Sequence, residues 1–259
     1  MNDVHTASIH TALSSGIISR PSIVGLMLGI FDAGFELNER ESFWQGTLPT
    51  SLPIQLRKLG YETNYWYGGS LSHGNFNHFA PACGFNHSYS GTDICGAKAP
   101  RSWVGVYDHV FLNKVADMIQ ERSDDVPQFH FVYTTSNHGP YKMPLKDLGF
   151  DAKKIMNVQP DVLKEKIIQK ALGTFWYADR AINDFIQKMK EAYPDSLFIV
   201  TGDHGYKCPE LQHTSFMRRE YTFRELHSPV LMFHHRELDK DSFSRQSHRK
   251  PHEYIADPF

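Results

Sequence analysis

Short apolar runs and longer amphipathic stretches alternate along the chain. The short runs are rich in β-branched and aromatic residues and predict buried strands at Phe129–Thr135, Leu197–Thr201 and Pro229–Phe233. The longer stretches place apolar residues at helical spacing and predict helices at Leu52–Leu59, Asp108–Arg122 and Val162–Ala192. Strands that alternate with helices indicate an α/β fold, with a mostly parallel central sheet and helices on both of its faces.

Two of these strands run directly into polar clusters, at Thr135–Tyr141 and at Thr201–Gly205. Ligand sites of parallel sheets collect at the carboxyl ends of the strands, so both clusters are candidate sites. In the second cluster Asp203 and His204 are flanked by glycines, and a carboxylate with an imidazole suits a divalent metal. The alternative is an aspartate in a turn beside a surface histidine. His138, in the first cluster, is either a substrate contact or a hydrogen-bonded structural residue.

A third candidate lies early in the chain, in the segment Ser14–Ser22 that precedes an apolar stretch. The hydroxyl of Ser19 is a weak nucleophile at neutral pH, and it needs a metal or a base nearby to activate it. A metal held by Asp203 and His204 would meet that need. Alternatively, Ser19 caps a helix that begins near Pro21.

The overall composition of 259 residues, 41% hydrophobic and 22% charged, predicts a single domain over residues 1–259. The net charge of −2 contains no long run of one sign, which excludes the basic face that nucleic-acid binding needs. No window reaches the roughly 18 apolar residues of a membrane span, and the start of the chain does not read as a signal peptide. Cys83 and Cys95 either close a disulfide loop or remain free thiols. Residues 237–259 are polar and weakly periodic, and we expect a poorly ordered tail there.

The string VTGDHG at 200–205, with the helix pattern at 171–182 before it, resembles the alkaline phosphatase/sulfatase superfamily, and within it the lipoteichoic acid synthase-like phosphoglycerol transferases. The resemblance covers about residues 10–235 and implies a three-layer α/β sandwich. It implies that Asp203, His204 and Ser19 bind the catalytic metal. The segment TTSNHGPY is similar to the family element whose histidine faces the substrate, which assigns His138 and Asn137 to substrate binding.

Two related signatures point to Ser19 as the nucleophile. Residues 19–23 fit four of the five places of the sulfatase string Cys/Ser-x-Pro-Ser-Arg. Ser19 also lies three residues after Gly16, as the nucleophile of the synthase-like enzymes does. Ile23 replaces the arginine of the sulfatase string, so we expect an unmodified serine rather than formylglycine. Only 18 residues precede Ser19, so we expect the acidic metal ligand of the family's first strand to be missing and the domain to be truncated at both ends.

Other positions depart from the family pattern. Gly74 and Phe76 stand where the synthases place a tryptophan and a substrate-binding arginine. His73 and His78 either supply the positive charge or hydrogen bonds that the missing tryptophan and arginine would provide, or lie exposed in a loop. His213 is either a further substrate contact or a residue of a solvated loop.

These residues and the resemblance together predict a metal-dependent transferase or hydrolase of phosphoesters that acts through a covalent seryl intermediate. One alternative is a sulfatase, and another is an inactive remnant with a binding role. The resemblance implies one divalent ion, manganese or zinc, with magnesium or calcium as alternatives. It implies a phospholipid head group or a glycan as substrate. It also implies membrane-anchored full-length relatives whose catalytic domain lies on the extracytoplasmic face of a bacterial inner membrane, in the periplasm or at the cell surface.

Overall fold

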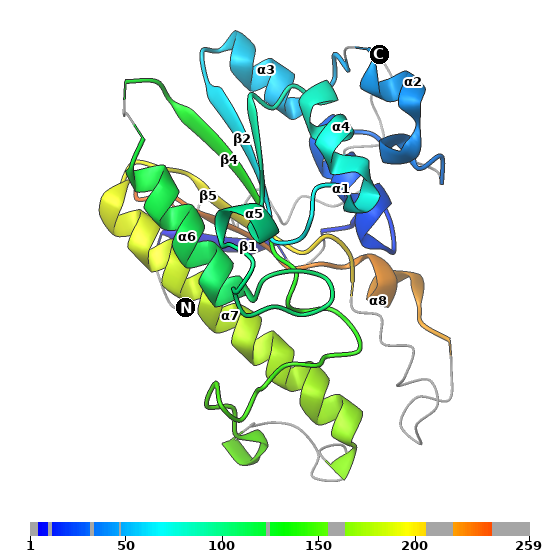
Figure 1. Ribbon diagram of the computed structural model, residues 1–259, viewed down its shortest axis with the longest axis vertical. Helices are drawn as coiled ribbons and strands as arrows, with labels where there is room; N and C mark the ends of the chain where they lie inside the picture. Colours follow the sequence, from blue (N-terminus) through cyan, green and yellow to red (C-terminus); the bar gives the residue numbers. More distant parts are fainter. Residues whose placement is uncertain are drawn as a thin grey trace.

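The computed structural model of the chain is an α/β fold with two three-stranded sheets (Figure 1). It describes residues 5–9, 12–31, 34–46, 48–122, 125–154, 164–205 and 220–239. In the first sheet β2 (Glu62–Tyr67) lies between β3 (His87–Ser90) and β4 (Gln128–Tyr133), and both pairings are parallel. In the second sheet the order is β1 (Thr6–Ile9), β6 (Leu231–His234), β5 (Phe198–Thr201), and both pairings are antiparallel.

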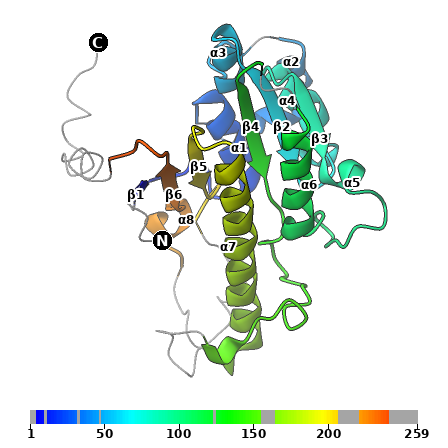
Figure 2. The same cartoon turned by 90° about the vertical axis from the view of Figure 1, so that its left-hand side faces the viewer.

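Helices cover the parallel sheet on both faces (Figures 1 and 2). One face packs against α1 (Ser19–Leu28) and α4 (Phe76–Ala82), and the other against α6 (Asp108–Gln120) and α7 (Lys166–Ala192). Successive side chains of a strand point to opposite faces. Tyr65 and Tyr67 of β2 therefore lie in the core beneath α1 and α4, while Trp66 lies in the core beneath α6 and α7.

The described residues also form shorter elements. They are α2 (Glu41–Trp44), α3 (Leu52–Lys58), α5 (Gly91–Ile94), α8 (Phe223–His227) and the 3₁₀ turns η1 (Leu37–Glu39), η2 (His73–Asn75) and η3 (Ala152–Lys154). Within the described ranges no helix combines the length and the apolar character that a membrane span requires.

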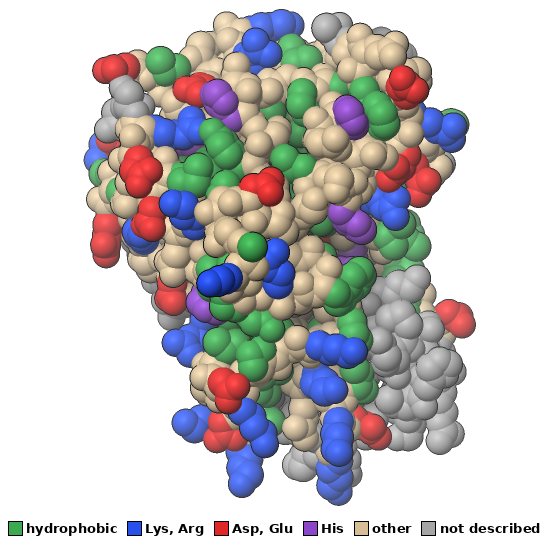
Figure 3. Space-filling view, in the orientation of Figure 1, with side chains coloured by type: hydrophobic (Ala, Val, Ile, Leu, Met, Phe, Trp, Pro, Cys, Tyr) green, Lys and Arg blue, Asp and Glu red, His purple; other side chains and the backbone are tan. Residues whose placement is uncertain are grey.

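The amino-terminal half of α7 projects beyond the sheets, and lysines gather around it at the lower end of the molecule (Figure 3). They come from the start of α7, from the residues just before it and from the loop after β4, and the exposed ones are Lys142, Lys146, Lys153, Lys154, Lys164, Lys166 and Lys170.

The predicted α/β class is confirmed, and each predicted element is present within a few residues. The helix predicted at Val162–Ala192 is α7, which begins at Lys166, and Val162 lies outside the described residues. Two details differ from the prediction. The strands β5 and β6 pair antiparallel rather than parallel, and β1, β2 and β3 were not predicted at all. Of the predicted tail, residues 240–259 lie outside the described residues.

The thiols of Cys83 and Cys95 are both free. Cys83 is buried in the core beneath α1 and α4, whereas Cys95 packs against the core beneath α6 and α7. The two side chains therefore lie on opposite faces of the parallel sheet, which rules out the disulfide that the sequence left open.

Candidate active site

The side chains of Ser19 and His204 meet although 185 residues separate them in the sequence. The distance from Ser19 Oγ to His204 Nε2 is 3.5 Å. Ser19 is the first residue of α1, and His204 follows the last residue of β5 by three positions. The N-cap of α1 is Ile18, so the interpretation of Ser19 as the cap of a helix near Pro21 is wrong. Its hydroxyl is directed at His204 instead.

The backbone of the turn after β5 orients the imidazole of His204. Nδ1 lies 2.7 Å from the carbonyl oxygen of Gly205, and because a carbonyl only accepts hydrogen bonds, Nδ1 carries the proton. In the neutral ring Nε2 then presents its lone pair towards Ser19. Asp203 Oδ2 lies 3.7 Å from the same nitrogen, and Asp203 Oδ1 accepts a hydrogen bond of 3.1 Å from the backbone N–H of His204. A histidine held in this way by a backbone carbonyl is oriented as metal-ligating histidines are.

Asp203, His204 and Ser19 offer a carboxylate, an imidazole and a hydroxyl, all of which divalent ions accept as ligands. Over the residues that the structure describes, however, no group of three or more His, Cys, Asp or Glu side chains is placed to hold a metal ion. The strand β1 has the sequence TASI and so brings no acidic residue. The three donors therefore fit a divalent ion without completing its coordination.

Tyr133 borders the same site, and sequence reasoning missed it. It is the last residue of β4, and its ring stacks on that of Tyr67 with 4.9 Å between ring centroids. Burial raises the pKa of Tyr133 far above its usual value, the charge of Asp203 raises it further, and a hydrogen bond with Ser19 opposes both effects. A neutral phenol thus lies beside both the hydroxyl of Ser19 and the carboxylate of Asp203.

A buried carboxylate holds the loop that follows β4. Asp108, at the start of α6, accepts hydrogen bonds from the backbone N–H groups of Thr135 and Ser136, each 3.0 Å long. Its own N–H donates to Ser136 Oγ over 2.9 Å. In α7, Thr174 Oγ1 donates to Asn137 Oδ1 over 3.0 Å, so the amide of Asn137 has a structural partner.

His138 is exposed, and its described contacts are local. Its Nδ1 lies 2.7 Å from the carbonyl oxygen of Gly139, and its ring meets that of Trp103 edge to face with 5.2 Å between centroids. The described contacts do not join His138 to Ser19 or His204. Its contact with a substrate stays a prediction.

The remaining predicted histidines are not brought to Ser19 by any described contact. His73 lies exposed in η2. His78 lies on α4 and stacks on Trp44 of α2 with 4.6 Å between ring centroids, so its interpretation as a loop residue is wrong. His213 falls within residues 206–219, outside the described residues.

The fold is that of the alkaline phosphatase superfamily. The chain is similar to the lipoteichoic acid synthase LtaP from Listeria monocytogenes, with a TM-score of 0.70 and 22% identity over 89% of this chain. A protein of the alkaline phosphatase superfamily from Vibrio parahaemolyticus gives a TM-score of 0.67 and 21% identity over 92% of this chain. This chain covers only 57% and 53% of those two chains. The C-terminal periplasmic domain of EcEptC from Escherichia coli, in complex with Zn, gives a TM-score of 0.63 and 14% identity, over 99% of this chain and 68% of that one.

The sequence profile of the sulfatase family matches residues 19–251, and the chain belongs to that family. The match begins at Ser19 and includes Asp203 and His204. The resemblance seen in the sequence is thereby confirmed.

Proposed function

We propose that this chain forms the catalytic core of a metal-dependent enzyme that transfers or hydrolyses phosphoesters. The observation that carries the proposal is the 3.5 Å approach of the Ser19 hydroxyl to His204, beside Asp203 and at the end of a strand. A nucleophile with metal-binding donors around it is the arrangement that attack on a tetrahedral ester needs.

Asp203, His204 and the Ser19 hydroxyl would hold the divalent ion. Such an ion lowers the pKa of a bound hydroxyl and polarises the ester oxygen. With its proton released to solvent, Ser19 Oγ attacks phosphorus, and the bond from phosphorus to the leaving oxygen breaks. His138 donates a proton to that oxygen and later takes one from the incoming hydroxyl. That hydroxyl, from water or an acceptor, attacks the seryl phosphoester and restores Ser19.

The relatives support a finer form of the proposal. A zinc complex of the EcEptC domain supports zinc as the ion, and manganese is the other candidate. Similarity to a lipoteichoic acid synthase supports a phospholipid head group as donor and a glycan or lipid as acceptor. The periplasmic location of the EcEptC domain supports an extracytoplasmic site of action, in a longer protein that is anchored to the membrane.

Metal content and hydrolysis of an aryl phosphodiester test the proposal. We expect bound zinc or manganese, and turnover that falls at least about 100-fold in both Ser19→Ala and Asp203→Ala. Asp184→Ala, an exposed aspartate on α7, is the matched control and should leave turnover unchanged. A folded protein with neither metal nor turnover would show that this chain is not an active enzyme and would favour a binding role.

The name of the matched family favours a second candidate, cleavage of sulfate esters. A sulfatase requires Ser19 to be oxidised to formylglycine, which removes two hydrogen atoms from the residue. Peptide mass spectrometry of the segment around Ser19 distinguishes the two chemistries, since phosphoryl transfer requires an unmodified serine.

A further inference from the structure

The carboxylate of Glu39 accepts hydrogen bonds from three side chains next to the start of α1. Oε1 accepts hydrogen bonds from Arg20 Nη1 at 2.9 Å and from Asn38 Nδ2 at 3.3 Å. Oε2 accepts one from Asn75 Nδ2. Arg20 is the residue that follows Ser19, so Glu39 fixes a guanidinium one residue from the candidate nucleophile.

The turn at Gly74 lies beside the stem of Arg20. Gly74 has φ +73°, and a Cβ added there would lie 3.6 Å from Arg20 Cδ and 3.1 Å from the ring of Phe76. The carbonyl of Gly74 accepts a hydrogen bond of 2.8 Å from Asn38 Nδ2, which links this turn to the Glu39 cluster. A larger residue at this position would be strained in its backbone and would crowd the ring of Phe76, whereas its contact with Arg20 would be an ordinary one.

Phe76 lies between this cluster and the candidate active site. It is 2% exposed, and its ring centroid lies 5.7 Å from that of Tyr67 and 6.4 Å from that of Tyr133, the residue beside Ser19. The side chain of Phe76 therefore points into the core and not to solvent. Arg20, the cationic residue next to Ser19 in the sequence, lies against the neighbouring turn.

The tetrahedral anionic group of an ester has non-bridging oxygens beyond the one that a bound metal would polarise, and these oxygens need donors of their own. The side chain of Arg20 remains 43% exposed while Glu39 holds it. Its described contacts engage Nη1, and a guanidinium has five N–H donors in a planar fork that matches two oxygens of a tetrahedral anion. Ser19, at the first position of α1, adds the backbone donors of a helix start.

We propose that Arg20 binds the non-bridging oxygens of the tetrahedral anionic group of the substrate, and that Glu39 is its positioning residue. The inference rests on the proposed function, since it assigns the specificity of that same site to phosphoryl or sulfuryl esters over neutral ones. In this proposal Arg20 contributes to the affinity for the substrate, whereas Ser19 carries out the nucleophilic attack.

Binding of inorganic phosphate, measured by calorimetry on the Ser19→Ala protein, tests the assignment without turnover. Adding Arg20→Ala should weaken the Kd about 10- to 100-fold, as expected for loss of a charge-assisted hydrogen-bond pair. Arg20→Lys should recover part of the loss, because a lysine keeps the charge without the fork. Arg40→Ala, an exposed arginine that donates to the carbonyl of Phe35, is the matched control and should leave the Kd unchanged.

A double-mutant cycle tests the role of Glu39. Glu39→Gln should weaken phosphate binding several-fold when Arg20 is present and have no effect in Arg20→Ala, an outcome that a merely structural role would not produce. Three results would overturn the inference: no phosphate binding by the Ser19→Ala protein, equal binding with and without Arg20→Ala, or an equal loss in the Arg40→Ala control. Activity is measured separately on the chain with Ser19 intact, so failure of the proposed function is a distinct result.

Discussion

Replacement of Asp108 tests whether this buried carboxylate works mainly as a hydrogen-bond acceptor for the loop that carries His138. The side chain is fully buried, and Oδ1 accepts two backbone N–H groups, from Thr135 and Ser136. Oδ2 is also buried and has no hydrogen-bond partner among the described residues. Asp108→Ala removes the shared acceptor, whereas Asp108→Asn keeps an oxygen in its place.

The two variants should differ clearly in stability. Each buried donor that loses its partner costs about 1–3 kcal/mol, and relief of the buried charge offsets part of that cost. We therefore expect Asp108→Ala to lower the free energy of unfolding by about 2–4 kcal/mol and Asp108→Asn to change it by less than about 1 kcal/mol. Asp117→Ala on the same helix is the control, since its ion pair with Lys188 is exposed and worth about 0–1 kcal/mol.

The pH dependence gives the same prediction a second test. Burial raises the pKa of Asp108 above its ordinary value of 3.8, although hydrogen bonds from Thr135 and Ser136 oppose the shift. A raised carboxyl pKa contributes stability that is fully present below 3.8 and is lost as pH rises through the folded-state pKa. Asparagine does not ionise, so Asp108→Asn should gain stability relative to the unmodified chain over that rise in pH.

Urea unfolding, extrapolated linearly to water at several pH values, measures both effects. Equal destabilisation by Asp108→Ala and Asp108→Asn at neutral pH would refute the reasoning, because it would show that the charge of Asp108 is needed rather than its acceptor oxygen.

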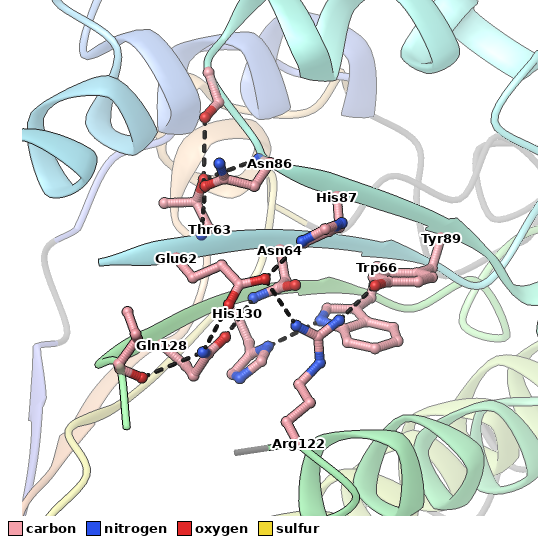
Figure 4. Close-up of polar contacts among 12 residues, drawn as sticks. Glu62, Thr63, Asn64, Trp66, Asn86, His87, Tyr89, Arg122, Gln128 and His130 are labelled. Carbon is pink, nitrogen blue, oxygen red and sulfur yellow. Dashed lines mark hydrogen bonds and ion pairs between the residues drawn. The ribbon is translucent and has the colours of Figure 1, made fainter. Parts of the chain in front are cut away.

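Two further predictions concern the packing of the parallel sheet. Burial, reinforced by the charge of Arg122, lowers the pKa of His130 to about 4, and its Nδ1 accepts a hydrogen bond of 3.1 Å from Trp66 Nε1 (Figure 4). The stability that the neutral His130 contributes is fully present above pH 6.5 and is lost as pH falls towards 4. His130→Gln should therefore lose less unfolding free energy than the unmodified chain over that range. An equal dependence of unfolding free energy on pH in the two proteins would contradict the lowered pKa of His130. Gly91→Ala should cost about 1–3 kcal/mol, because a Cβ there meets the carbonyl of Gly68, whereas Gly46→Ala has open space around it and should cost little in the same urea experiment.

The sequence predicted the parts of the site that follow apolar strands. Asp203 and His204 come just after the run that forms β5, and the predicted strand end together with the residue types there located them. His138 follows β4 in the same way, and its contact with a substrate stays a prediction. Tyr133 was missed because it continues the aromatic pattern of β4 and looks like any core residue. The sequence assigned no role to Arg20, because its ion pair with Glu39 joins residues 19 positions apart.

There are physical reasons why the sequence did not predict β2 and β3. The sequence of β2 is ETNYWY, in which Glu62 and Asn64 interrupt the apolar pattern. Both of these side chains form a hydrogen bond with the side chain of Gln128. β3 is short and polar, with the sequence HSYS. The antiparallel pairing of β5 and β6 could not be predicted, because single-sequence periodicity carries no information on strand direction.

Helix α8 explains how the Ser19 and His204 segments, so distant in sequence, come within 3.5 Å of each other. Its last residue, His227, binds the Ser14 backbone twice: its carbonyl accepts from the N–H of Ser14 at 2.7 Å, and its Nδ1 lies 3.0 Å from the carbonyl of Ser14. One residue earlier, the carbonyl of Leu226 accepts from the N–H of Gly205 at 2.8 Å. One short helix thus anchors both the segment that enters α1 and the turn that carries the candidate metal donors Asp203 and His204. A side chain at Gly205 would collide with the backbone of α8, so this glycine is required for the contact rather than for the turn alone. The contacts of α8 therefore help to set the distance between Ser19 and His204, and neither sequence motif by itself contains that information.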